Sequence, residues 1–152
     1  MHLPLGVSSF QGFLDHLRIT AMREIDDTPT PRGDLALQTL AMPGDTNPNG
    51  DIFGGWLMSQ MDLAGYITAS RRAEGRTATV AVTGMAFLTP VKVGSVVSCY
   101  TTIEEVGRSS IRISVEVWID PHRNPVKVTE GEFVFVAIDT NGRTRAVPDN
   151  GD

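Results

Sequence analysis

The sequence has very little cysteine, since Cys99 is the only one among 152 residues. One cysteine cannot form a disulfide within the chain, and the paired-cysteine spacings of common zinc sites are absent. Both facts exclude a fold held together by disulfides or zinc and are typical of a reducing compartment. We therefore expect a cytoplasmic protein that uses no metal and no other cofactor.

Long hydrophobic runs and an excess of positive charge are also missing. The longest apolar stretches, such as residues 133–138, are far shorter than the roughly 20 residues that cross a bilayer. The first residues do not combine a basic start with an apolar run. The 13 Lys and Arg are outnumbered by 18 Asp and Glu, which gives a net charge of -5. We expect neither membrane insertion nor nucleic-acid binding through bulk positive charge.

The length suits one folded domain preceded by an extension. Residues 1–33 differ from the rest, because apolar side chains with helical spacing are followed by a polar segment with two prolines, residues 24–33. The apolar set consists of Phe10, Phe13, Leu14, Leu17 and Ala21. It predicts either a loosely ordered extension or a short docking helix, and the polar segment predicts a linker. We expect the folded domain to comprise residues 34–152.

The pattern after residue 33 predicts one strand, one helix and four more strands. Residues 35–40 form a short strand before a turn-rich segment, and residues 56–73 form a proline-free helix, apolar on nearly every side, that we expect to be buried. Strand-like residues fill 77–87, 96–106, 111–119 and 126–138. Alternation is sharpest in residues 111–119, so one face of that strand packs inward. The economical arrangement is an antiparallel sheet curled around one helix, an α+β architecture.

The densest chemical signal lies where the expected helix begins. Asn49 and Gly50 mark a turn, and Gly54 and Gly55 fall at the helix start. Glycine lets a ligand approach the free backbone N–H groups there, whose partial positive charge suits an anion or a developing oxyanion. A tight loop that enters a crowded helix would explain the same glycines equally well.

Asp62 decides between these two interpretations. It lies in the middle of the helix among Leu, Met, Ala and Ile residues, where an ionised carboxylate costs several kcal/mol unless it is paired or hydrogen-bonded. Either Asp62 fastens the preceding loop by accepting its N–H groups, or it lies near the oxyanion donors as a base or nucleophile. We favour the second, which makes Asp62, Gly54 and Gly55 the candidate catalytic centre.

Histidine and cysteine offer no better chemistry. His2 and His16 fall in the extension and His122 in a proline-flanked turn, so a Ser-His or Cys-His pair has no credible base. Cys99 lies in an alternating strand without a basic neighbour, and we expect it to be a small core residue. No glycine-rich nucleotide-binding fingerprint follows a strand.

The side chains that could bind an anion lie at the helix end and in two turns, and they are Arg71, Arg72, Lys92, Arg108, Ser109 and Ser110. Arg71 and Arg72 also complement the charge of the helix C-terminus, which explains them without any ligand. The turn at Arg108 is more suggestive, because a guanidinium, two hydroxyls and turn amides together can hold a phosphate.

These residues together resemble a known family. The run DTNPNGDIFGGWLMSQMD at 45–62, preceded by TLAMP at 39–43, closely resembles the YciA-type acyl-CoA thioesterases of bacteria, which have the hotdog fold. The likeness covers residues 33–148, includes the segments 96–100, 107–110 and 116–118, and does not reach the extension. It implies hydrolysis of an acyl-CoA thioester to a free acid and CoA, a reaction of fatty-acid metabolism that needs no serine nucleophile.

The resemblance also implies roles for individual residues. The family's catalytic carboxylate falls on Asp62, and its loop-to-helix glycines fall on Gly54 and Gly55. Hotdog thioesterases form the active site between two subunits, so Asn49 or Asp51 would face Asp62 from the partner. Dimers that assemble into hexamers are expected, with CoA bound by the basic residues and hydroxyls named above.

Two other functions are compatible with the same fold, since a fold does not fix a function. A non-catalytic acyl-CoA-binding or sensing module is one, although a carboxylate kept in an apolar helix argues against it. A hotdog dehydratase or hydratase is the other, but it would need a histidine beside the acid, and the core has none. The sequence does not predict the length of the acyl chain.

Overall fold

A computed structural model describes residues 29–150 of the chain. The fold below is that of the unit that begins at Pro31. Of the expected extension, residues 1–33, only the last five positions fall within the described residues, so the proposed docking helix lies outside them. Among residues 29–150 the structure contains no helix with the length and hydropathy of a membrane-spanning segment.

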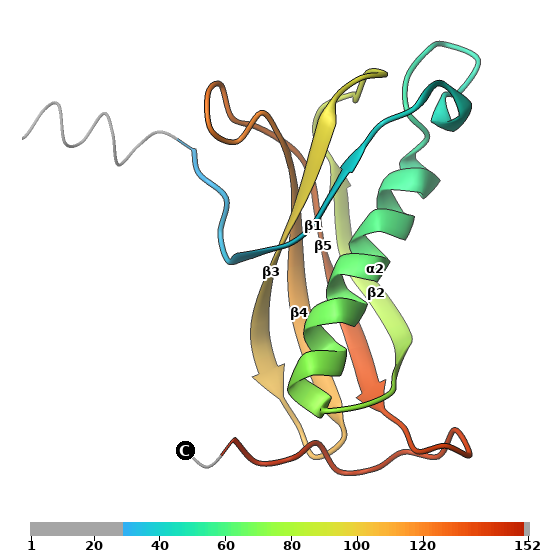
Figure 1. Cartoon of the computed structure of the whole chain (residues 1–152), viewed down its shortest axis with the longest axis vertical. Coiled ribbons are helices and arrows are strands. Elements are labelled where there is room, and N and C mark those ends of the chain that lie inside the picture. The colour runs from blue at the N-terminus through green and yellow to red at the C-terminus, as the bar shows by residue number, and fades with distance from the viewer. Residues whose placement is uncertain (1–28, 151–152) are drawn as a thin grey trace, which may run out of the picture. The chain divides into compact units, whose positions relative to one another are not determined.

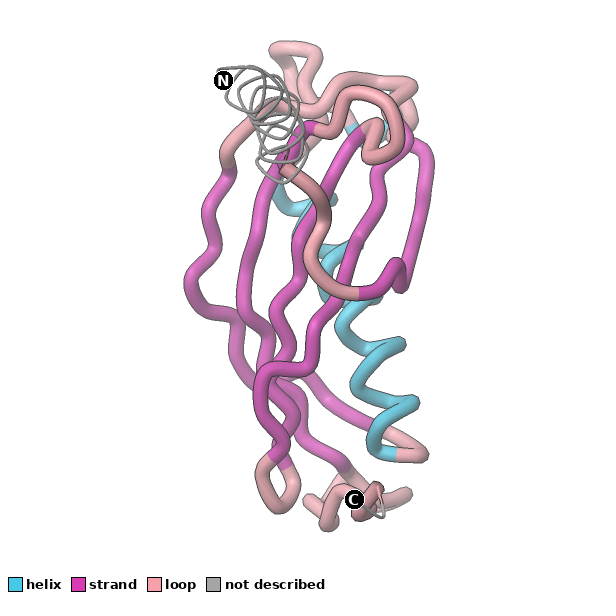
Figure 2. The backbone as a smooth tube through the Cα atoms, turned by 90° about the vertical axis from the view of Figure 1, so that its left-hand side faces the viewer, coloured by secondary structure: helices cyan, strands magenta, loops and turns pink. Residues whose placement is uncertain are grey.

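Five antiparallel strands form one sheet in the order β1-β3-β4-β5-β2. The strands are β1 (Asp34–Leu40), β2 (Thr77–Phe87), β3 (Val96–Val106), β4 (Ser110–Ile119) and β5 (Val126–Ala137). The helix α2 (Gly54–Ala73) follows the short 3-10 turn η1 (Pro43–Asp45) and lies along one face of the sheet (Figures 1 and 2). The predicted element order and the α+β class are confirmed, and the strand and helix bounds differ from the expected ones by at most two residues.

The core lies between α2 and the sheet. Residues two apart on a strand share a face, and β4 accordingly buries Ile111, Ile113, Val115 and Val117. On β5 the rings of Phe133 and Phe135 stack with their centroids 6.4 Å apart. A Cβ atom at Gly65 would lie 2.8 Å from the Phe135 ring, so the lack of a side chain there lets α2 approach β5 closely.

Cys99 belongs to this core, as expected. Its side chain is fully buried in β3, and burial raises the pKa of the thiol to about 12. A thiol of this kind is not ionised near neutral pH and is a poor nucleophile.

The expectation that α2 is buried on nearly every side is wrong for the single chain. Its sheet-facing side is buried (Leu57, Met61, Ala64, Ala69 and Ala73), but Leu63 is 50% exposed and Tyr66 is 44% exposed. One sheet can cover only one face of one helix. Val80 and Val82 of the neighbouring edge strand are also exposed, and exposed apolar side chains on adjacent elements are typical of an association surface.

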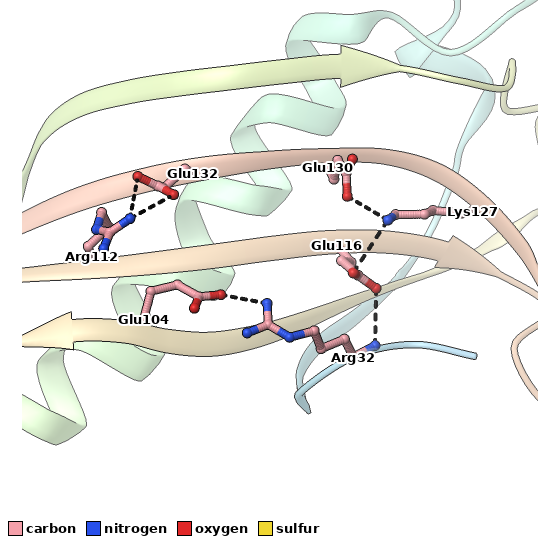
Figure 3. A network of polar contacts seen from close by, with 7 residues as sticks. All are labelled: Arg32, Glu104, Arg112, Glu116, Lys127, Glu130 and Glu132. Carbon is pink, nitrogen blue, oxygen red and sulfur yellow. Dashed lines mark hydrogen bonds and ion pairs between the residues drawn. The ribbon is translucent and has the colours of Figure 1, made fainter. Parts of the chain in front are cut away.

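The face of the sheet turned away from α2 carries a network of charges (Figure 3). Glu116 is buried, and its Oε1 accepts the backbone N–H of Arg32 at 3.0 Å and the Trp118 Nε1–H at 2.9 Å. Lys127 Nζ lies 3.4 Å from Oε2. The hydrogen bond and charge of Arg32 hold the pKa of the Glu104 carboxyl below its usual value. The network therefore attaches the start of the domain to β3 and β4.

Candidate active site

The start of α2 presents backbone donors without a capping side chain. The helix begins at Gly54, two residues earlier than expected, and its N-cap is Phe53, whose side chain has no atom that can accept a hydrogen bond. The N–H groups of Trp56 and Leu57 donate to the carbonyl of Phe53 at 3.1 and 3.3 Å. Within residues 29–150, the N–H groups of Gly54 and Gly55 have no acceptor. Two donors are therefore free at the positive end of the helix dipole.

The loop before the helix is held in shape by its own polar groups. Asn47 Oδ1 accepts the N–H groups of Asn49 and Asp51 at 2.9 and 3.0 Å, and the N–H of Phe53 donates to the Asp45 carbonyl at 2.9 Å. Sequence reasoning did not single out Asn47, although an Asn just before a turn is a known signal for a side chain that bonds backbone N–H groups further along. The loop thus presents Gly54 and Gly55 in a fixed position.

A pocket of about 350 Å³ between α2 and β2 brings two of the expected residues together. Gly55 and Asp62 line it from the helix, and Thr79 and Val82 line it from β2. The Thr79 hydroxyl donates to Asp62 Oδ1 at 2.6 Å. Asp62 is half-buried, so its carboxylate has one firm hydrogen bond and still reaches the pocket.

The alternative role of Asp62, fastening the loop, finds no support in these contacts. No loop N–H between residues 41 and 53 donates to Asp62, and its hydrogen-bond partner is the Thr79 hydroxyl instead. The loop is fastened by Asp45 and Asn47. Sequence reasoning missed Thr79, because nothing in the local pattern of β2 marks it.

Three other expected catalytic residues do not line this pocket in the single chain, and they are Gly54, Asn49 and Asp51. The Asp51 carboxylate pairs with Lys92, and Asp51 lines a second pocket of about 310 Å³ at the N-terminal end of α2. Asn49 is exposed, and its side chain makes no hydrogen bond to any described residue. Lys92, an expected CoA ligand, therefore lies at the glycine end of the helix and already has a partner.

The remaining expected CoA ligands gather at the opposite end of α2. Arg72 Nη1 donates to the Pro148 carbonyl at 2.6 Å, and the Arg108 carbonyl accepts the N–H of Val147 at 2.7 Å. Residues 147 and 148 thus link the helix end to the β3–β4 turn. At a rise of 1.5 Å per residue, Gly55 and Arg72 are about 25 Å apart along the helix.

The arginines at this end differ in what their side chains already bind. The Arg72 guanidinium is occupied by Pro148, and that of Arg76 by the carbonyls of residues 139 and 140. The side chains of Arg71 and Arg108 make no hydrogen bond or ion pair with residues 29–150. Ser109 and Ser110 directly follow Arg108, Ser110 as the first residue of β4, and both are half-buried. Of the expected CoA ligands, Arg71 and Arg108 therefore have guanidinium groups available to an external anion.

The sequence of this chain is similar to those of known proteins. The family described as the thioesterase superfamily matches residues 49–126, which include all of α2 and β2. A protein of Salmonella typhimurium named acyl-CoA thioester hydrolase YciA is 53% identical over 127 residues, covering 80% of this chain and 96% of the relative. An uncharacterized acyl-CoA thioester hydrolase of Haemophilus influenzae is 55% identical over 122 residues, covering 77% of this chain and 79% of the relative.

Solved structures show the same fold. A hexameric thioesterase from Yersinia pestis is 53% identical with a TM-score of 0.75, and the match covers 79% of this chain and 99% of that one. An acyl-CoA hydrolase from Staphylococcus aureus, solved with butyryl coenzyme A and coenzyme A, is 30% identical with a TM-score of 0.69. That match covers 74% of this chain and 70% of the other.

Proposed function

The chain belongs to the thioesterase superfamily, among the YciA-type acyl-CoA thioester hydrolases, and we propose that it hydrolyses the thioester of acyl-CoA to a carboxylic acid and CoA. One observation carries this proposal. Asp62, fixed by Thr79, shares a pocket with Gly55, whose N–H is free at the start of α2. A carboxylate and an uncapped donor in one pocket are what attack on a carbonyl requires.

Gly55 is the proposed oxyanion donor. As the thioester carbonyl is attacked, negative charge develops on its oxygen, and a donor already in place stabilises that charge without reorganising. One such donor is typically worth about 3–4 kcal/mol of barrier. Gly54 supplies a neighbouring N–H and, like Gly55, no side chain that would block the approach.

Asp62 can act in two ways. As a general base it takes a proton from water while the water oxygen attacks the carbonyl carbon, after which the C–S bond breaks and the thiolate leaves. As a nucleophile it attacks the carbonyl itself, expels the thiolate and forms a mixed anhydride that water then hydrolyses. A rapid-quench mass measurement separates the two, since only the second adds the mass of the acyl group to the chain.

Thr79 is the proposed positioning residue for Asp62. Its hydroxyl binds Oδ1 at 2.6 Å, while Oδ2 has no hydrogen-bond partner within residues 29–150. Thr79 thus fixes the carboxylate plane and leaves the second oxygen for the substrate or water. Asn49 or Asp51 of a second copy would complete the site, and alanine variants of each residue distinguish the two.

The CoA part of the substrate is proposed to reach the arginine end of α2. Arg71 and Arg108 offer guanidinium groups without protein partners, and Ser109 and Ser110 add hydroxyls beside them. Arg72, whose guanidinium binds the Pro148 carbonyl, adds positive charge to this cluster. Lys92 is paired with Asp51 at the other end of α2 and is not part of the cluster. Phosphate groups are well matched by such a cluster.

The proposed assembly is a hexamer built from dimers. The Yersinia pestis relative is described as hexameric, and the uncovered Leu63, Tyr66, Val80 and Val82 supply apolar surface for contacts between copies. Light scattering on a sizing column tests this, with six times the monomer mass expected. A cytoplasmic location is likewise proposed from the cysteine content alone, and cell fractionation tests it.

The decisive experiment is the variant Asp62→Asn in a thiol-release assay over short, long and aromatic acyl-CoAs. We expect turnover to fall at least about a hundredfold with the fold and the oligomer intact, because the amide keeps the shape but is neither base nor nucleophile. Asp149→Asn, in the exposed C-terminal segment, is the matched control and should keep its activity. Near-normal turnover in folded Asp62→Asn, or wild-type protein that binds acyl-CoA without releasing thiol, would overturn the proposal.

A further inference from the structure

A second pocket adjoins the N-terminal end of α2. It has a volume of about 310 Å³, and most of its wall is apolar, from Ile52, Leu57, Phe87, Leu88 and Val91. Its one charged group is Asp51, which is already paired with Lys92. A pocket with this lining suits an apolar ligand rather than a phosphate or a nucleotide.

The two pockets follow one another along the same helix and strand. Asp62 and Thr79 are in contact near the middle of α2, and Gly55 lines the same pocket as Val82, three residues further along β2. At the end of this line, a Cβ atom on Gly54 would come within 3.3 Å of the Phe87 ring, and both residues line the second pocket. The carbonyl position beside Gly55 therefore lies next to the mouth of the apolar pocket.

The walls of the second pocket are fixed by backbone hydrogen bonds. The N–H of Ile52 donates to the Val91 carbonyl at 2.9 Å, which ties the loop before α2 to the loop after β2. The N–H of Leu88 donates to the Val128 carbonyl at 2.8 Å. Phe87 is different, because the residue is 51% exposed and its ring lies next to Gly54. A substitution that changes the size of the Phe87 side chain should therefore change the volume of this pocket most directly.

We propose that the acyl chain of the substrate occupies this pocket and that Phe87 sets the chain length the enzyme prefers. This rests on the proposed thioesterase activity, since the carbonyl has to lie beside Gly55. On one side of the thioester carbonyl the substrate has the apolar acyl chain, and on the other side it has the CoA moiety, which carries the phosphates. The apolar pocket lies at the glycine end of α2 and the free arginines at the other end, so these two parts diverge in opposite directions along the helix.

The experiment measures kcat/KM for saturated acyl-CoAs from acetyl to hexadecanoyl in wild type, Phe87→Ala and Phe87→Trp. Each methylene buried in an apolar pocket raises kcat/KM by about fourfold, so the profile should rise with length until the pocket is full. Phe87→Ala should raise the ratio of long-chain to short-chain kcat/KM by about tenfold or more, and Phe87→Trp should lower it. Val93→Ala removes an exposed apolar side chain of the same connection that does not line the pocket, and it should leave the ratio unchanged.

The outcomes separate this inference from the proposed function. If wild type hydrolyses acyl-CoAs and both Phe87 variants, folded by their melting curves, keep the wild-type length profile, the acyl chain lies elsewhere and the inference is wrong. A profile that responds to Met58→Ala and not to Phe87→Ala would place the chain beside Asp62 and would also overturn it. If wild type releases no thiol from any acyl-CoA, it is the thioesterase proposal that fails.

Discussion

The substitution Gly65→Ala tests how the close contact between α2 and β5 supports the site. A Cβ atom at this position would lie 2.8 Å from Cε2 and Cζ of Phe135, a ring that is fully buried. The next atom, Val115 Cγ2, would be at an ordinary contact distance of 3.8 Å. The helix or the ring must therefore shift by several tenths of an ångström, and the surrounding core leaves the ring little room.

Two opposing effects set the size of the change in stability. Overpacking a well-packed core lowers the free energy of unfolding by about 1–3 kcal/mol. Replacing glycine by alanine inside a helix raises it by roughly 0.5–1 kcal/mol. We expect overpacking to win, with a net loss of about 1 kcal/mol and a fall in Tm of roughly 3–6 °C for a domain of this size. Asp62 lies three residues before Gly65, nearly one helical turn, so the shift should also move Asp62 away from Thr79 and lower kcat.

The assay combines thermal unfolding with thiol release, and its control is the double variant Gly65→Ala with Phe135→Leu. Leucine removes the ring atoms that the new methyl group meets, so the loss of stability in the double variant should be smaller than the sum of the two single losses. A higher Tm for Gly65→Ala alone, as helix propensity would give, would refute the overpacking argument. Restored stability without restored kcat would refute the link to Asp62.

Three further predictions concern the rest of the chain. Arg108→Ala should raise KM for acyl-CoA more than it lowers kcat, and less so at high salt, because a distant phosphate contact binds ground and transition states alike; a substrate without the nucleotide should show no effect. The Cys99 thiol should resist Ellman's reagent in native protein at pH 8. Because its folded pKa is about 12 against roughly 8.5 unfolded, unfolding scans should show stability falling as pH rises between these values. Deleting residues 1–22 should leave oligomer size, Tm and turnover unchanged.

Much of the fold could be predicted because the sequence patterns are regular. Strict alternation in residues 111–119 fixed both the strand and its inward face, and glycine or proline marked the turns on either side of the other strands. The start of α2 was harder. Gly54 and Gly55 are poor helix formers, and no Ser, Thr, Asp or Asn stands at the N-cap, so the local signals favoured a start at Trp56. The structure extends the helix through both glycines.

The candidate site was only partly predictable, because its contacts join residues that are distant in the sequence and lie on different elements. Asp62 stands out by its chemistry alone, since a carboxylate in an apolar helix needs a partner. That partner, Thr79, is 17 residues away, and it meets the helix because β2 pairs with β5 at the sheet edge. Local alternation places Thr79 on a face of β2 but does not select the helix residue opposite it. The same is true of Arg72 and Arg108, which residues 147 and 148 bring together.

The exposed apolar surface and the candidate site lie on the same two elements. Val80 and Val82 on β2, and Leu63 and Tyr66 on α2, are uncovered in the single chain, and Val82 also lines the Asp62 pocket. An oxyanion donor is worth most where water is excluded, because the surrounding dielectric is low there. A second copy that covers this surface would bury the apolar side chains and close the pocket at the same time. Assembly and catalysis would therefore both be favoured by the exclusion of water from the surface formed by α2 and β2.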